Sequence, residues 1–173
     1  MKVKNGFTYK KNGWTYISIK GEPYERGFAH GTLLKEEIKK CISTMEWNLY
    51  DSHGLEIDFF KEISNFFFKK TIEEHFPEFL TEMKGIATGA GVDLDEIVLW
   101  NNIASLDYAL PKLKLYLDDM PILKEKYGHL LEALPAIGQM EGGSKDKCSA
   151  FMALGDYTHD GKICCAHNSF DNF

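Results

Sequence analysis

The residues at the carboxyl end of the chain bring several reactive side chains onto one short hairpin. Cys148 opens an alternating apolar segment, a turn follows at His159-Asp-Gly-Lys162, and a second apolar segment runs from Ile163 to Ala166. Two such segments joined by a turn pair as antiparallel strands. We therefore expect His167 and Asn168, which follow the second strand, to return close to Cys148.

The same residues of this hairpin allow two other interpretations, namely packing residues and a zinc site. Cysteine is among the most buried residue types, and a cysteine and a histidine on one hairpin are more often packing residues than reactive ones. A zinc site could be drawn from Cys148, Cys164, Cys165 and His167. Zinc ligands are usually separated by two to four residues, whereas adjacent strand residues point to opposite faces. The spacing disfavours zinc, and we expect no metal.

Three motifs occur in a fixed order along residues 21 to 173. They are Gly21-Glu-Pro-Tyr-Glu-Arg-Gly-Phe-Ala-His-Gly31; Met83-Lys-Gly-Ile-Ala-Thr-Gly-Ala-Gly91 with Val92-Asp-Leu-Asp-Glu-Ile97; and Cys148-Ser-Ala-Phe151 with Thr158-His-Asp-Gly-Lys162 and Ala166-His-Asn-Ser-Phe170. The ordered set resembles the autoproteolytic Cys hydrolases and acyltransferases, which include the penicillin acyltransferase-like (C45-type) enzymes and the phospholipase B-like proteins. The resemblance implies an N-terminal nucleophile (Ntn) hydrolase.

In such enzymes the precursor cleaves itself before a cysteine, which becomes the new amino terminus. The resemblance places that cleavage between Lys147 and Cys148. The freed Cys148 would carry a thiol with a pKa of about 8.5 and an α-amine with a pKa of about 7.7–8.0, so the amine can take the proton of the thiol. Attack on an amide or ester carbonyl would give a thioester, which water or another amine resolves. This chemistry needs no cofactor.

The resemblance also assigns partners to the nucleophile. His167 would be a catalytic partner, as in the phospholipase B-like branch, and Asn168 would orient the amine or donate a hydrogen bond to the oxyanion. Asp171 is a further candidate, since the alignment can shift by one residue at this point. The small-residue stripe of the first motif further predicts that His30, with Gly27 and Gly31, packs against the hairpin and that His30 lines the mouth of the site; the alternative role of His30 is helix packing.

The fold implied by the resemblance is α+β, the leading part of an Ntn αββα sandwich. We expect residues 1–147 to form a strand pair and a helical pro-segment, and residues 148–173 to begin a truncated catalytic β-chain within the same domain. Family members continue beyond the hairpin. We therefore expect an amino-terminal fragment that is inactive alone and partners the remainder of its precursor. A phospholipase B-like lipid deacylase and a non-catalytic pro-segment are the alternatives.

Composition limits the class of protein. A length of 173 residues suits one ordinary domain, and an apolar content of 44% excludes a disordered chain. The formal charge of −6 without a basic stripe argues against nucleic acid. The resemblance implies a small acylated substrate (amide, ester or lipid) as the ligand. The sequence shows neither a membrane span nor a signal peptide, and its four cysteines form no dense disulfide framework. We expect a cytoplasmic protein; an exported protein whose signal is not in this sequence is the alternative.

Local patterns predict the remaining elements. Asn12-Gly13 predicts a hairpin of residues 7–9 and 14–20. Pro23 begins an apolar stripe that continues at steps of three and four residues to Leu49, which predicts one long helix. Gly27 and Gly31 lie on this stripe, and two glycines one turn apart predict the close approach of another backbone.

Further helices are expected over residues 71–88 and 93–109, with Asp93 and Glu96 capping the second. Shorter helices broken near Pro121 should follow. The aromatic residues between 58 and 70 are interpreted as core, with an acyl pocket as the alternative.

Overall fold

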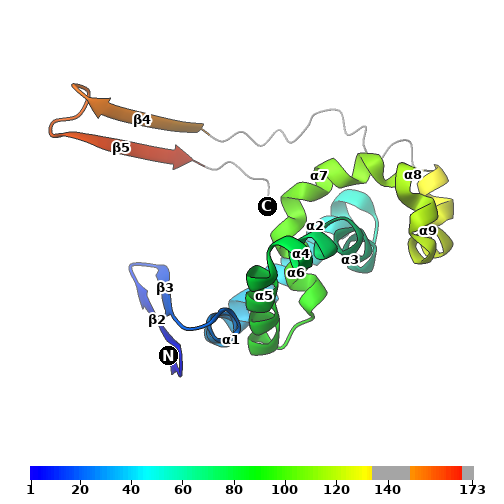
Figure 1. The fold of residues 1–173 in the computed structure, drawn as a ribbon, viewed down its shortest axis with the longest axis horizontal. Coiled ribbons are helices and arrows are strands. Elements are labelled where there is room, and N and C mark those ends of the chain that lie inside the picture. Colours follow the sequence, from blue (N-terminus) through cyan, green and yellow to red (C-terminus); the bar gives the residue numbers. More distant parts are fainter. Residues whose placement is uncertain (134–148, 169–173) are drawn as a thin grey trace. The chain divides into compact units, whose positions relative to one another are not determined.

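The computed structural model describes residues 1–133 and 149–168 of the chain (Figure 1). The chain divides into two compact units, Met1–Gly138 and Gln139–Phe173, and each is described by itself. The first unit contains a three-stranded sheet and a block of helices, and the second contains a two-stranded sheet. The mixture of helices and small antiparallel sheets confirms the α+β class.

The first sheet follows the predicted hairpin and adds one short strand. Its strands are β1 (Lys2–Val3), β2 (Gly6–Lys11) and β3 (Trp14–Ile19), all antiparallel. Asn12 and Gly13 have φ angles of 53° and 81°, which is the left-handed pair that a tight type I′ turn requires. The hairpin prediction is therefore confirmed; the two-residue β1 was not predicted.

The predicted long helix is divided in two. α1 (Pro23–Leu33) begins at Pro23 as expected, but Leu34 leaves the helical region with φ −117° and ψ 29°, and α2 (Lys35–His53) starts after it. The two parts of the stripe pack against different neighbours, because α1 packs mainly on α5 whereas α2 contacts α3, α5 and α6. The prediction of one continuous helix was wrong for this reason.

The two glycines of α1 allow a close helix contact. They face α5 (Pro77–Ala90), which carries Gly85 and Gly89 at the same four-residue spacing. A methyl group added to any of the four glycines would overlap a backbone carbonyl oxygen of the opposite helix. The predicted approach of a second backbone is confirmed, and this backbone belongs to the second sequence motif. The prediction that Gly27 and Gly31 pack against the carboxyl-terminal hairpin was wrong, because the backbone of α5 lies against both glycines.

The remaining helices of the first unit form a chain of short segments. They are α3 (Ile57–Ser64), the π-helical η1 (Asn65–Lys69), α4 (Lys70–His75), α6 (Leu94–Asn102), η2 (Ile103–Ser105), α7 (Leu106–Ala109), η3 (Leu110–Lys112), α8 (Leu113–Tyr116), η4 (Leu117–Asp119) and α9 (Pro121–Ala133). The capping box of Asp93 and Glu96 before α6 is confirmed, as is the break near Pro121. The helix expected over residues 71–88 is interrupted at Phe76, because a helix seldom continues through the residue before a proline.

A hydrophobic core joins α3 to the later helices. Phe59, Phe60 and Ile63 of α3 are fully buried, and the ring of Phe59 packs edge-on against both Phe60 and Tyr127. The core interpretation of this aromatic segment is confirmed for these residues. A second, smaller cluster forms where Ile42 of α2, Ala87 of α5 and Ile97 of α6 meet.

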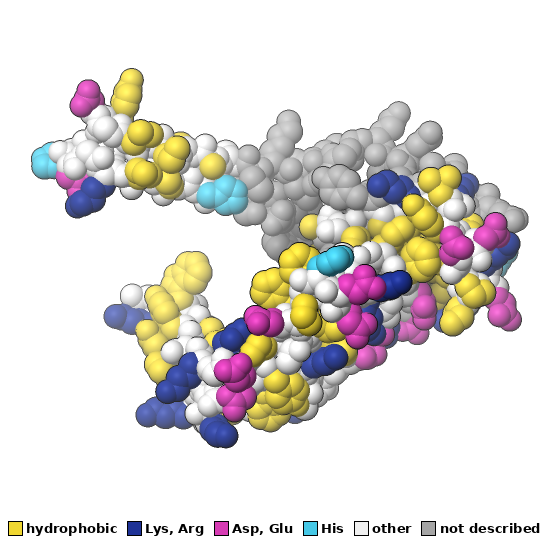
Figure 2. Space-filling model, viewed as in Figure 1, with side chains coloured by type: hydrophobic (Ala, Val, Ile, Leu, Met, Phe, Trp, Pro, Cys, Tyr) yellow, Lys and Arg dark blue, Asp and Glu magenta, His cyan; other side chains and the backbone are white. Residues whose placement is uncertain are grey.

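The second unit contains the predicted carboxyl-terminal hairpin. Its strands are β4 (Ser149–Gly155) and β5 (Gly161–Asn168), and β5 extends beyond the predicted Ile163–Ala166 at both ends. Large apolar side chains on the hairpin are more than half exposed, namely Phe151, Met152, Leu154 and Ile163. Figure 2 shows hydrophobic side chains spread over the visible face of this hairpin.

Candidate active site

The pairing of β4 with β5 fixes the residues that surround the start of the hairpin. Asn168 lies opposite Ser149, and His167 lies opposite Ala150. Cys148 directly precedes Ser149 in the sequence and, with Lys147 and Asp171, lies outside the described residues. The structure thus brings the backbones of His167 and Asn168 beside the first two residues of β4, while the catalytic roles remain predictions.

His167 sits on a mixed polar and apolar strip of the hairpin. Ala150 pairs with His167 and Met152 pairs with Cys165, and residues two apart on a strand share a face. These side chains border a shallow groove, and His167 is exposed along it. An exposed imidazole beside the start of β4 is accessible to a reacting group.

The two adjacent cysteines of β5 lie on opposite faces of the hairpin, as the alternation of side chains along a strand predicts. Cys164 and Cys165 are exposed free thiols that pair with successive residues of β4, so they occupy opposite faces. Among the residues that the structure describes, no group of three or more His, Cys, Asp or Glu side chains is arranged to hold a metal ion. The zinc alternative also involves Cys148, which lies outside that set.

His30 lies in the first unit, on α1, and its side chain is half-buried. It borders a pocket of about 500 Å³ together with Phe76, Phe79, Glu82 and Asn101. Burial lowers the pKa of His30 below its ordinary value of 6.5, and the Glu82 carboxylate acts more weakly in the opposite direction. The imidazole is therefore neutral at pH 7. Its predicted packing against the hairpin stays a prediction, because the hairpin belongs to the other unit.

Glu82 is fixed in this pocket by an arginine from the first motif. Arg26 of α1 donates from Nε (3.2 Å) and Nη2 (2.6 Å) to Oε2 of Glu82 on α5, and its Nη1 donates to the carbonyl of Gly21. The pair spans the glycine contact between the two helices. Sequence reasoning missed this pair, although Arg26 directly precedes Gly27 and Glu82 stands three residues before Gly85.

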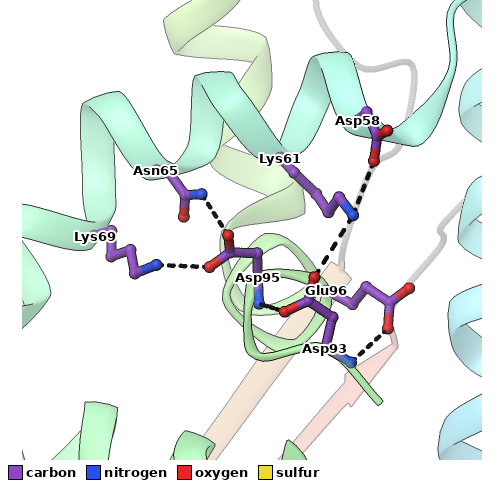
Figure 3. Close-up of polar contacts among 7 residues, drawn as sticks. All are labelled: Asp58, Lys61, Asn65, Lys69, Asp93, Asp95 and Glu96. Atoms are coloured by element: carbon purple, nitrogen blue, oxygen red, sulfur yellow. Dashed lines mark hydrogen bonds and ion pairs between the residues drawn. The ribbon is translucent and has the colours of Figure 1, made fainter.

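A second polar network lies between the π-helical segment and the start of α6 (Figure 3). Asp95 accepts hydrogen bonds from Asn65 (2.8 Å) and Lys69 (2.6 Å), the first and last residues of η1. Lys61 lies between Asp58 (2.9 Å) and Asp93 (3.8 Å). The network therefore ties the helix that contains α3 and η1 to the cap of α6.

The protonation of Asp95 follows from this network. Burial raises the pKa of Asp95, but hydrogen bonds from Lys69 and Asn65 and the charges of Lys69 and Lys61 together outweigh it and leave the pKa below 3.8. Sequence reasoning missed this site. A signal was present, because Lys61, Asn65 and Lys69 recur at four-residue steps and so form a polar line on an aromatic helix.

Replacing Asp95 by asparagine is expected to destabilise the first unit by about 1–2 kcal/mol, since a partly buried, doubly hydrogen-bonded carboxylate loses its charge. Folding lowers the pKa of Asp95. The contribution of its carboxylate to the free energy of unfolding is therefore complete above pH 3.8 and is lost as the pH falls through the lowered pKa. Urea unfolding at a series of pH values measures both effects.

The matched control is Asp58→Asn, because the Asp58 carboxylate is 58% exposed and also pairs with a lysine. We expect this variant to change stability by no more than about 0.5 kcal/mol. Equal losses in the two variants, or an Asp95→Asn loss that persists unchanged in acid, would contradict the assignment.

Comparison with known proteins identifies a distant relative in an archaeon. The chain is 26% identical over 167 residues to an uncharacterised protein of Archaeoglobus fulgidus, in an alignment that covers 88% of this chain and 24% of the relative. The chain thus spans about a quarter of the relative's length. No protein-family model matches the chain. Within residues 1–133 and 149–168, no helix is both long enough and apolar enough to cross a membrane.

Proposed function

We propose that this chain is the leading part of an autoproteolytic Cys-nucleophile hydrolase or acyltransferase that acts on amide or ester bonds. In this proposal Cys148 is both the residue of self-cleavage and the nucleophile, and His167 and Asn168 are its polar partners. The fold would be an Ntn αββα sandwich, completed by the remainder of the same precursor.

The observation that carries the proposal is the register of the hairpin. Ser149, the residue after Cys148, pairs with Asn168, and Ala150 pairs with His167. If the residue directly before β4 is the nucleophile, two polar residues would therefore end the neighbouring strand beside it. A shift of the register by one residue would move every side chain of β5 to the other face of the hairpin, so the proposal requires this particular register.

The exposed apolar surface of the hairpin supports a layered architecture. Phe151, Met152 and Ile163 are each more than 60% exposed. A two-stranded hairpin is only marginally stable in water, and three or more strands or a packed helix are needed to stabilise it. Further strands and helices of a sandwich would cover this surface and pair the strand edges.

Self-cleavage would proceed by an acyl shift. The Cys148 thiol attacks the carbonyl carbon of Lys147, the bond from that carbon to the Cys148 nitrogen breaks, and the nitrogen takes up a proton as an amine. Water then hydrolyses the resulting thioester to a Lys147 carboxylate and a free Cys148 thiol. The product carries the thiol and the α-amine on one residue.

The freed amine would then act as the base for substrate chemistry. It removes the thiol proton, the thiolate adds to the substrate carbonyl, and the amine returns the proton to the departing amine or alcohol. Asn168 would donate a hydrogen bond to the oxyanion that forms in this step. Water releases the acyl group as an acid, whereas a second amine releases it as an amide.

The acyl-enzyme provides the test of this function. The processed full-length protein would be incubated with an activated acyl ester, an acyl amide and a lysophospholipid, quenched in acid, and digested for mass spectrometry. We expect an acyl adduct on the peptide that begins with Cys148, and a reaction with the lysophospholipid alone would favour the lipid deacylase. An adduct on another cysteine, or no adduct from any substrate, would contradict the proposal.

A further inference from the structure

The pocket beside His30 combines three hydrogen-bond acceptors with an aromatic wall. Its volume of about 500 Å³ lies within the range of small-molecule sites, which is roughly 300–1,000 Å³. Helices α1, α4, α5 and α6 all contribute to it, so it is built from one packed unit. No step of the chemistry proposed for Cys148 uses it.

Glu82 offers one oxygen to a ligand. Both guanidinium hydrogen bonds from Arg26 end on Oε2, at 3.2 and 2.6 Å, so Oε1 remains an acceptor within the described part of the chain. The Glu82 side chain is only 24% exposed. The hydrogen bonds from Arg26 orient this carboxylate before a ligand arrives, and its partial burial strengthens its attraction for a positive charge relative to open water.

Asn101 and His30 offer further acceptors. The Asn101 amide nitrogen donates to the carbonyl of Ile97 at 2.8 Å, and this bond leaves the amide oxygen as the acceptor end. A neutral imidazole has one nitrogen that accepts a hydrogen bond. The pocket therefore presents oxygen and nitrogen acceptors from Glu82, Asn101 and His30.

The wall of the pocket suits an apolar or aromatic body. Phe76 and Phe79 are stacked with ring centroids 5.9 Å apart, and they are 50% and 59% exposed. Met83 adds an adaptable apolar surface on α5. Exposed aromatic rings beside a carboxylate favour a ligand that joins a positive charge to an apolar or aromatic body, because the rings can pack against that body.

We propose that this pocket binds a small primary amine, with its ammonium group on Glu82, Asn101 and His30 and its apolar body on Phe76 and Phe79. An ammonium group has three N–H donors, which matches the three acceptor side chains. A carboxylate ligand is disfavoured, since it would place a second negative charge beside Glu82. The inference does not depend on Cys148, and a Cys148→Ala variant is expected to bind the amine equally well.

The test uses 2-phenylethylamine as the probe and ligand-observed saturation-transfer NMR on the chain. We expect saturation to reach the aromatic protons of the probe. The matched alcohol, 2-phenylethanol, should bind about tenfold more weakly, because it replaces a charged donor by a neutral one. 3-Phenylpropionate should show no competition. Equal binding of the amine and the alcohol, or no transfer to the amine, would overturn the proposal.

Two variants separate the charge of Glu82 from its structural pairing. Glu82→Gln and Arg26→Gln both disrupt the same ion pair, but only the first removes the carboxylate. We expect Glu82→Gln to weaken amine binding about tenfold, and Arg26→Gln to weaken it clearly less, because the second variant loses an orienting partner but keeps the carboxylate and removes a competing cation. Phe79→Ala, at an exposed position, should also weaken binding. Equal losses in Glu82→Gln and Arg26→Gln would show a structural role and contradict the site.

Discussion

Gly85→Ala and Gly31→Ala will each destabilise the helical unit by about 3 kcal/mol, a large part of the roughly 5–15 kcal/mol that stabilises an ordinary domain. The added methyl group at Gly85 would overlap the carbonyl oxygen of Tyr24, and the one at Gly31 would overlap that of Ile86. Neither obstacle is a flexible side chain, so the two helices must move apart. Urea unfolding followed by far-ultraviolet circular dichroism measures the loss.

The separation of α1 from α5 would also break contacts beyond the glycines. The Arg26–Glu82 pair bridges the same two helices, and Gly27 and Gly89 would lose their close approach as well. We therefore expect Gly85→Val to prevent cooperative folding altogether. A soluble valine variant that melts like the wild type would show that the helices do not pack in this way.

Gly128→Ala is the matched control. Gly128 lies inside α9, and a methyl group there would meet only Lys124 Cγ at 3.8 Å, which is an ordinary contact. Alanine is more favourable than glycine in a helix by about 1 kcal/mol. The control should therefore stabilise the protein slightly. A loss of stability in Gly85→Ala and a gain in Gly128→Ala would distinguish steric overlap from a general effect of replacing glycine.

Cys148→Ala is expected to leave the full-length precursor as one chain without acyl-transfer activity. The reason is chemical, because alanine can neither attack the Lys147 carbonyl nor supply a thiol for the substrate. Intact mass and amino-terminal sequencing would follow processing, and release of the acyl group would follow activity. We expect complete loss of both, rather than a partial reduction.

The other cysteines provide the controls. Cys41→Ala, Cys164→Ala and Cys165→Ala should all be processed normally, because these exposed thiols lie elsewhere in the sequence. Cys148→Ser should cleave slowly, since a hydroxyl can undergo the same acyl shift, and it should hydrolyse substrate poorly. A Cys164→Ala or Cys165→Ala variant that folds but fails to cleave would move the nucleophile away from Cys148.

Local physical rules made several parts of the fold predictable from sequence. Asn12-Gly13 specified its turn through the left-handed backbone that these residues tolerate, and Asp93 with Glu96 specified a helix start. Pro121 marked the start of α9 because proline suits a first helical turn. Each of these features depends on a few neighbouring residues, so no knowledge of the tertiary structure was needed.

Features that depend on distant neighbours were harder to predict. The break at Leu34 reflects the different partners of α1 and α2, and the π-helical segment carries the two residues that reach Asp95 from another helix. The interruption at Phe76 is different, because Pro77 in the sequence already indicates a helix boundary at this position. The glycine spacing of α5 was likewise visible, but only the structure identified it as the partner of α1.

The candidate site was predictable to a similar extent. Alternating apolar residues and a turn were sufficient to predict the hairpin and the return of His167 and Asn168 toward its start. The extension of β5 to include these two residues was not predicted, since polar residues usually mark the end of a strand in a sequence pattern. The pocket beside His30 depends on four helices, which is why Glu82 and Asn101 were not grouped with it.

The most direct test of the central claim is the intact mass of the wild-type full-length precursor, together with the amino-terminal sequence of its products. We predict two chains whose masses sum to that of the precursor plus one water, with the second chain beginning Cys-Ser-Ala-Phe at Cys148. A precursor that stays one chain, or a new amino terminus at any other residue, would contradict the account.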